Sequence, residues 1–221
     1  MSSAVRMIEE HILYQDEAII ILNKPSGLLS VPGLYNKDSA FGRLEALVDE
    51  LHIIHRLDKD TSGLIVYGRT KKDLTAIQQQ FEKQTTRKVY EARVTGKVKG
   101  NQGTINMPII VDWPNRPLQK ISHTEGRYAL TRWKKLAEEL VVAESGAEEI
   151  VTRMELYPKT GRSHQLRLHM LNIGHPIVGD PFYSKDYDES QTPTMHLHAR
   201  ELSFNHPRTG ERMDMVCPPP F

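Results

Sequence analysis

The sequence has one cysteine, few aromatic residues and no long apolar run. Cys217 stands alone among 221 residues. No disulfide can therefore form within the chain, which favours a reducing, cytoplasmic compartment. Three prolines follow Cys217 and no base stands beside it, which argues against a catalytic thiol.

No stretch approaches the roughly 20 apolar residues of a membrane helix. Residues 1–10 are polar, unlike a signal or transit peptide, so we expect a cytoplasmic protein without a membrane partner.

The formal net charge is also small, at +1, and this excludes a strongly basic tail. A nucleic-acid partner would have to meet local groups of cations instead. Three such groups occur, at Arg69, Lys71 and Lys72, at Arg87, Lys88, Arg93, Lys97 and Lys99, and at Arg116 and Lys120. Taken singly, each group is more typical of a solvated surface than of a binding site.

Strand patterns outnumber helix patterns along the chain. Short apolar or alternating runs predict strands at 18–22, 64–67, 87–95, 150–156 and 198–204. Apolar spacing predicts helices at 71–82, 39–48 and 163–173, the last closed by Gly174. The acidic segment 138–149 is expected to be a surface hairpin or loop, and 184–194 a flexible loop. Because strands and helices do not alternate regularly, the pattern favours an α+β fold with a mostly antiparallel sheet.

The segment 55–64 concentrates groups that carry chemistry, with an imidazole, a guanidinium, two carboxylates and two hydroxyls. It leads directly into an apolar strand, and a rigid strand can hold reactive side chains at the rim of a cleft. Taken alone, the segment is more simply explained as a solvated turn in which Asp58 or Asp60 caps backbone N–H groups.

A family resemblance favours the catalytic interpretation. The run His55-Arg56-Leu57-Asp58, followed by Thr61-Ser62-Gly63-Leu64, resembles the signature of the RluA-type pseudouridine synthases. Further family motifs follow the same order along the chain. They match Asn23-Lys24-Pro25-Ser26-Gly27-Leu28, Lys88-Val89-Tyr90-Glu91-Ala92, Gly161-Arg162-Ser163-His164-Gln165-Leu166-Arg167-Leu168-His169, Gly174-His175-Pro176-Ile177-Val178-Gly179-Asp180 and Leu197-His198-Ala199. Together the matches span about residues 13–204.

The resemblance implies one pseudouridine synthase catalytic domain over residues 1–221. Its expected fold is a bent, mixed but mostly antiparallel sheet in two halves, with flanking helices and a central cleft, and we place the boundary near 95–125. Many relatives carry an N-terminal S4 RNA-binding domain. Here the motifs begin near residue 20, so no S4 domain is expected and the catalytic domain itself would select the RNA.

The resemblance also assigns the chemistry, which breaks the glycosidic bond of a uridine and rejoins the base through C5. Asp58 is the expected nucleophile, and no cofactor or metal is required. Its carboxylate could add to C1′, add to C6 or support a glycal route, and the sequence does not choose among them. Arg162 would pair with Asp58 through its planar guanidinium group, and it would lie at the start of the third predicted helix. Tyr90 would stack on the target base, and Leu166 would form an apolar wall.

Substrate contacts are expected around this centre. The target uridine must leave its stack, and Arg56 could fill the vacated space. His55, Trp113 and Arg116 are also assigned to substrate binding. The run Asp112-Trp113-Pro114-Asn115-Arg116-Pro117 resembles a subgroup that modifies both the tRNA anticodon stem-loop and 23S rRNA. We expect dual specificity for these RNAs and a monomer that needs no protein partner.

Alternatives remain open for single residues and for the whole chain. Arg162 could instead contact phosphate or lie on the surface, and Tyr90 could be ordinary core. A metal hydrolase could use His196 and His198, and EDTA would test it, although no HExxH motif or cysteine cluster completes a site. A glycosidase needs two carboxylates across the bond, and no second acid stands out. An RNA-binding module without turnover would make Asp58 dispensable.

Overall fold

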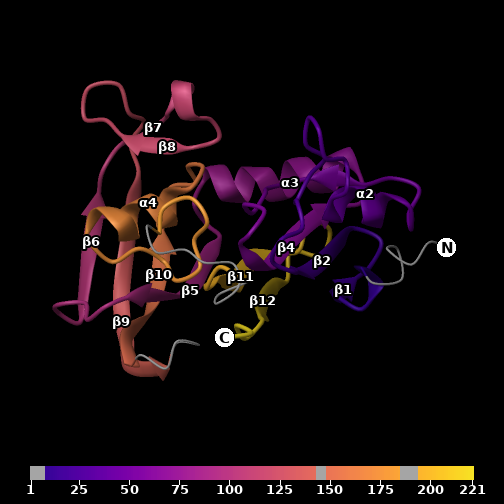
Figure 1. Ribbon diagram of the computed structural model, residues 1–221. Coiled ribbons are helices and arrows are strands. Elements are labelled where there is room, and N and C mark those ends of the chain that lie inside the picture. Colours follow the sequence, from indigo (N-terminus) through magenta and orange to yellow (C-terminus); the bar gives the residue numbers. More distant parts are fainter. Residues whose placement is uncertain (1–7, 143–147, 185–193) are drawn as a thin grey trace. The chain divides into compact units, whose positions relative to one another are not determined.

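The computed structural model describes residues 8–142, 148–184 and 194–221 (Figure 1). The chain divides into two compact units. The first unit comprises Met1–Lys88 and His198–Pro220, and the second comprises Val89–Leu197 and Phe221. Each unit has its own hydrophobic core, so each can be described by itself.

The first unit is built on a sheet whose strands follow the order β1-β2-β4-β11, with β3 paired to β4 and β12 paired to β11. The strands are β1 (Ile12–Gln15), β2 (Ile19–Lys24), β3 (His52–Ile53), β4 (Ser62–Gly68), β11 (Leu197–Asn205) and β12 (Arg212–Val216). The pairings are antiparallel except β4 with β11, which run parallel through the pairs His198–Ser62 and Ala199–Gly63.

Two helices accompany this sheet. Helix α3 (Lys71–Glu82) starts at Thr70, whose hydroxyl accepts a hydrogen bond from the Asp73 N–H. Its Ile77 is fully buried in a core that also contains Ile19, Val66 and Phe204. The short helix α2 (Ala40–Glu45) is capped in the same way by Ser39.

The second unit has an antiparallel sheet in the order β5-β10-β9-β6. Its strands are β5 (Arg87–Thr95), β6 (Gln102–Asn106), β9 (Leu130–Val142) and β10 (Glu148–Pro158), and a separate hairpin consists of β7 (Ile109–Val111) and β8 (Gln119–Ile121). Helix α4 (Gln165–Asn172) contributes Leu166 and Met170 to a core shared with the sheet residues Ala92 and Leu156. One face of the sheet is therefore apolar.

The predicted α+β class with a mostly antiparallel sheet is confirmed, and most predicted elements are found. Helix α3 and strand β5 have the predicted bounds, and segment 138–149 supplies the facing ends of β9 and β10. Helix α2 is shorter than expected, and the division into units falls at Lys88, before the range expected. Residues 143–147 and most of the loop predicted at 184–194 lie outside the described residues. In the part described, no helix is long and apolar enough to cross a membrane.

Candidate active site

The loop that carries Asp58 lies in the first unit, between β3 and β4. We call residues 55–61 the Asp58 loop. It closes with a tight turn in which the Thr61 N–H donates to the Asp58 carbonyl at 3.2 Å. Two residues later, Gly63 has a φ of +106°, and a Cβ there would lie 2.4 Å from the Ala199 carbonyl oxygen. A glycine is needed at this point because the backbones of β4 and β11 approach so closely. The loop therefore leads into a strand whose first residues are held in place.

A buried lysine holds the Asp58 loop to the segment that follows β2. Lys24 is fully buried, and its Nζ donates to the carbonyls of Pro25, Leu28 and Lys59 at 2.7–2.9 Å. Burial lowers the pKa of Lys24 to about 7, and the Asp60 and Asp58 carboxylates act in the opposite direction. The ammonium form has three N–H groups, one for each acceptor. Lys24 thus ties two backbone segments together directly beside the candidate nucleophile.

Two serines reinforce the same attachment. The Ser30 hydroxyl donates to the Leu57 carbonyl at 2.7 Å and accepts from the Leu57 N–H at 3.0 Å. Ser26 donates to the Asp60 carbonyl at 2.7 Å. The buried Tyr67 hydroxyl from β4 donates to the Ser30 carbonyl at 3.0 Å. The backbone on both sides of Asp58 is therefore fixed by side chains, while Asp58 itself stays partly exposed.

His55 and Arg56 occupy contrasting places in this loop. The His55 Nε2 accepts from the Val66 N–H at 3.1 Å, and its ring lies 5.0 Å from that of Phe81. Burial, with a smaller contribution from Lys88, lowers the pKa of His55 to about 3, so the ring is neutral. His55 therefore anchors the loop, and its predicted substrate contact stays a prediction.

Arg56 is exposed and forms no ion pair with any described residue, so its guanidinium is available to a ligand.

Tyr90 and Leu166 lie together in the second unit. Tyr90 is half-buried on β5 opposite Leu156 and packs against the apolar core that contains Leu166. Leu166 is 7% exposed. Core packing and a pocket wall are both consistent with this placement. The stacking of Tyr90 on a base stays a prediction.

Arg162 lies three residues before α4, not at its start. The helix begins at Gln165, and its N-cap residue His164 has a left-handed φ of 54°. The predicted position at a helix N-terminus is therefore wrong. The physical reason is the Gln165 side chain, whose Oε1 accepts from the Arg162 N–H at 3.0 Å and from the Thr160 hydroxyl at 2.7 Å. These bonds hold residues 160–164 as a turn.

The Arg162 side chain is directed by a single protein contact. Its Nε donates to the Tyr128 carbonyl at 3.0 Å. Within the described residues, its two terminal nitrogens have no hydrogen-bond acceptor, so they can receive a carboxylate or a phosphate. Because Arg162 and Asp58 belong to different units, their ion pair stays a prediction.

Trp113 and Arg116 form an exposed turn between β7 and β8. We call residues 112–117 the Trp113 turn. Trp113 is 63% exposed, and the Arg116 guanidinium lies 4.2 Å from the centre of its ring. Asp112 accepts from Asn115 at 2.8 Å and pairs with Lys120 at 3.3 Å. A flat aromatic ring and a cation on a solvent-exposed turn suit contact with unpaired bases.

The histidines considered as metal ligands are engaged in other contacts. The His198 Nδ1 lies 2.8 Å from the Ser62 hydroxyl, and its Nε2 lies 3.0 Å from the Cys217 carbonyl. The His196 ring stacks on Phe221, and burial lowers its pKa to about 4. In the chain as described, no three or more His, Cys, Asp or Glu side chains gather into a metal site.

Sequence reasoning missed the residues that fix the loops. Lys24 and Gln165 lie within the family motifs but received no role, and Ser30 lies just outside them. Lys24 follows the apolar run 19–22, but lysine is rarely buried, so the pattern alone would place it on the surface. The other two are ordinary polar residues that nothing in the pattern distinguishes.

Comparison with known proteins identifies the family of this chain. Residues 18–172 match the family model described as RNA pseudouridylate synthase. The chain is 44% identical over 212 residues to the dual-specificity RNA pseudouridine synthase RluA of Vibrio vulnificus, covering 95% of this chain and 83% of that protein. It is 42% identical to the RluA of Escherichia coli over 95% of this chain and 93% of that one.

Solved structures agree on the fold. The human RNA pseudouridylate synthase domain containing 1 superposes with a TM-score of 0.78 at 26% identity, covering 95% of this chain and 83% of that one. The human RNA pseudouridylate synthase domain containing 4 has a TM-score of 0.75 at 24% identity, covering 98% and 91%, and shows the fold alone. Given the match over most of its length, this chain belongs to the RluA-type RNA pseudouridine synthases.

Proposed function

We propose that this protein converts uridine to pseudouridine in both the tRNA anticodon stem-loop and 23S rRNA, with Asp58 as nucleophile and without a cofactor. The observation that carries dual specificity is the identity of 42–45% over 95% of the chain to relatives named dual-specificity RNA pseudouridine synthase RluA. The exposed Trp113 turn supports it, because an exposed ring and guanidinium can meet bases in differently shaped loops.

The architecture of the Asp58 loop supports the nucleophile. Covalent catalysis needs a carboxylate oxygen held at a fixed position against the sugar or the base. Lys24, Ser26 and Ser30 hold the backbone at Lys59, Asp60 and Leu57, on both sides of Asp58. The partly exposed carboxylate can then meet a uridine whose position the RNA contacts determine.

The remaining residues have roles in presenting that uridine. We propose that Arg56 enters the space left when the base is flipped, because its side chain is exposed and unpaired within the described chain. Tyr90 supports the flipped base, and Leu166 closes the apolar side of its pocket. Arg162 directs its terminal nitrogens at the Asp58 carboxylate.

The decisive experiment is a map of pseudouridine in tRNA and in 23S rRNA after incubation with wild-type protein or with Asp58→Asn. Asparagine keeps the shape of the side chain and removes its charge. We expect new pseudouridine in both RNAs with wild type and none with Asp58→Asn. Equal product from Asp58→Asn would contradict the nucleophile, and product in only one RNA class would contradict dual specificity.

Asp60→Asn is the matched control, since Asp60 lies two residues away in the same loop. Its carboxylate acts on Lys24 through its charge but has no proposed contact with substrate, so most turnover should persist. If a folded wild-type protein made no pseudouridine in either RNA while still binding both, the enzymatic proposal would fail in favour of an RNA-binding module.

A further inference from the structure

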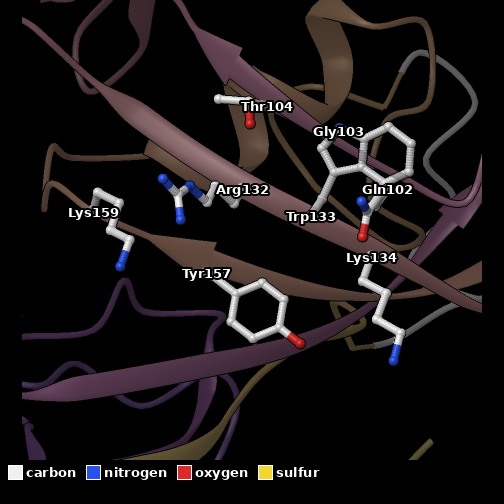
Figure 2. A pocket seen from close by; sticks show the side chains of 8 residues that line it. All are labelled: Gln102, Gly103, Thr104, Arg132, Trp133, Lys134, Tyr157 and Lys159. Carbon is white, nitrogen blue, oxygen red and sulfur yellow. The ribbon is translucent and has the colours of Figure 1, made fainter.

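A hollow in the second unit has the composition of an anion site. It measures about 650 Å³ and is formed by β6, β9 and the end of β10. Three cations line it, Arg132, Lys134 and Lys159, together with the ring of Tyr157. Figure 2 shows Lys134, Tyr157 and Lys159 extending to the same side of the strands. None of these four residues belongs to the candidate active site.

Strand register places these side chains on one face of the sheet. Tyr157 pairs with Arg132, which pairs with Thr104, and Lys134 pairs with Gln102 on β6. Directly paired residues point to the same face, and neighbours along a strand point to opposite faces. Arg132, Lys134 and Tyr157 therefore share a face, and Lys159, two residues beyond Tyr157, continues it.

The opposite face belongs to the apolar core. Tyr90 pairs with Leu156, which pairs with Trp133 on β9. Trp133 lies across Gly103, where an added Cβ would come within 2.7 Å of the indole ring. The cations of the hollow and the residues around Tyr90 are thus on opposite sides of the same sheet.

Four cations elsewhere on or beside this sheet are neutralised. Arg93 and Arg153 both pair with Glu139, and Lys97 and Lys135 both pair with Glu138. Within the described residues, by contrast, Arg132, Lys134 and Lys159 form no ion pair, and all three are exposed. Like charges that lie close together without ion-pair partners repel one another, so a cluster of this kind is suited to an external anion.

One carboxylate lies beside the cluster. Glu155 is the direct partner of Lys134 in the β9–β10 register, and it accepts a hydrogen bond from the Tyr157 hydroxyl. Three cations against one carboxylate leave the hollow positive. The Tyr157 hydroxyl is directed to Glu155, and its ring lines the hollow.

We propose that this hollow binds the phosphate backbone of substrate RNA outside the loop that contains the target uridine. Exposed cations without ion-pair partners are the usual composition of a surface that contacts an RNA backbone. The position opposite the Tyr90 face implies a contact with more distant parts of the RNA. The inference rests on the proposed function, because that function supplies RNA as the ligand.

The test compares Arg132→Gln/Lys134→Gln/Lys159→Gln with a control that loses the same charge elsewhere, Lys37→Gln/Lys83→Gln/Arg212→Gln. The control residues are exposed and lie in the first unit. The dissociation constants for full-length tRNA and for the isolated anticodon stem-loop are measured between 50 and 200 mM salt, and turnover is measured separately on the stem-loop.

We expect the hollow variant to bind full-length tRNA more weakly and with a salt slope smaller by about 2, at roughly 0.7 for each phosphate that is no longer neutralised. Over a fourfold rise in salt, wild-type affinity would then fall about 16-fold more than that of the variant. Binding and turnover on the stem-loop should match wild type. The control should keep the wild-type slope.

Two results would overturn the inference. One is the same affinity and salt slope for the hollow variant and the control. The other is an equal loss on the isolated stem-loop, which would place the contact at the target loop. A wild-type protein that bound tRNA but formed no pseudouridine would instead contradict the proposed function, and the binding comparison would still decide the role of the hollow.

Discussion

The Asp58 loop and the Trp113 turn are both expected to meet RNA, yet they are held in opposite ways. The Asp58 loop receives hydrogen bonds from Lys24, Ser26 and Ser30, two of which are fully or almost fully buried. The Trp113 turn is exposed and held mainly by Asp112 contacts within itself and to Lys120. A reacting group needs one fixed geometry, whereas a recognition surface that serves two RNAs gains from adaptability.

The largest effect is expected from Lys24→Met, which keeps the side-chain length and removes all three donors. Three carbonyls would lose their partner, and an unsatisfied buried acceptor costs about 1–3 kcal/mol. We expect a lower free energy of unfolding and a fall in kcat that exceeds any rise in KM. Chemical denaturation and stem-loop kinetics would measure both.

Lys59→Met is the matched control, because that lysine is exposed in the same loop and only its carbonyl is used. It should leave stability and kcat near wild type. If both variants behaved alike, the buried ammonium would not be what holds the loop.

The second prediction concerns pH and His55. Folding lowers the pKa of this histidine from its ordinary value of 6.5 to about 3, so between these values the unfolded chain binds one more proton. Its contribution to the free energy of unfolding is fully present above pH 6.5 and is lost as pH falls, by up to about 1.4 kcal/mol per pH unit. Between pH 7 and 5, wild type should lose about 2 kcal/mol more than His55→Gln.

Glutamine suits that comparison because its side-chain oxygen can still accept from the Val66 N–H while it cannot titrate. His196 also has a lowered pKa, but it is present in both proteins and its contribution cancels. Equal pH dependence in the two proteins would show that His55 is not the group that links the Asp58 loop to acid stability.

A smaller effect is expected from Ser30→Ala. Its hydroxyl serves both the N–H and the carbonyl of Leu57, and loss of both bonds should cost about 1–3 kcal/mol. Ser26→Ala removes a single bond, to the Asp60 carbonyl, and should cost less. Thermal unfolding would rank the two. A larger loss for Ser26→Ala would mean that the loop is fixed from its Asp60 side.

Sequence periodicity was sufficient for the elements but not for these attachments. Helix α3 was predicted with its bounds because apolar residues recur at helical spacing. The start predicted for helix α4 is two residues early, because nothing local reveals that the Gln165 side chain closes a turn onto Arg162. Side-chain bonds to backbone leave no periodic signal in a sequence.

The candidate site residues could be proposed from the sequence only through the family resemblance. The motif resemblance singled out Asp58, Tyr90 and Arg162, which composition alone could not distinguish from surface or core residues. The burial of Lys24 was not predicted, since lysine is rarely buried and its acceptors are the carbonyls of Pro25, Leu28 and Lys59. Every residue type has the same backbone carbonyl, so only the structure could reveal these acceptors.

The smallest effect on stability is expected from Trp113→Ala. The ring is 63% exposed, so the free energy of unfolding should stay within about 0.5 kcal/mol of wild type. Loss of one stacked base should still raise KM about tenfold, because stacking contributes about 1–3 kcal/mol per base. Trp113→Phe retains an aromatic face and should recover most of the affinity. A loss of stability at unchanged KM would instead show that the Trp113 turn serves the fold and not RNA recognition. The Trp113 turn and the Asp58 loop would then differ only in where they lie in the chain.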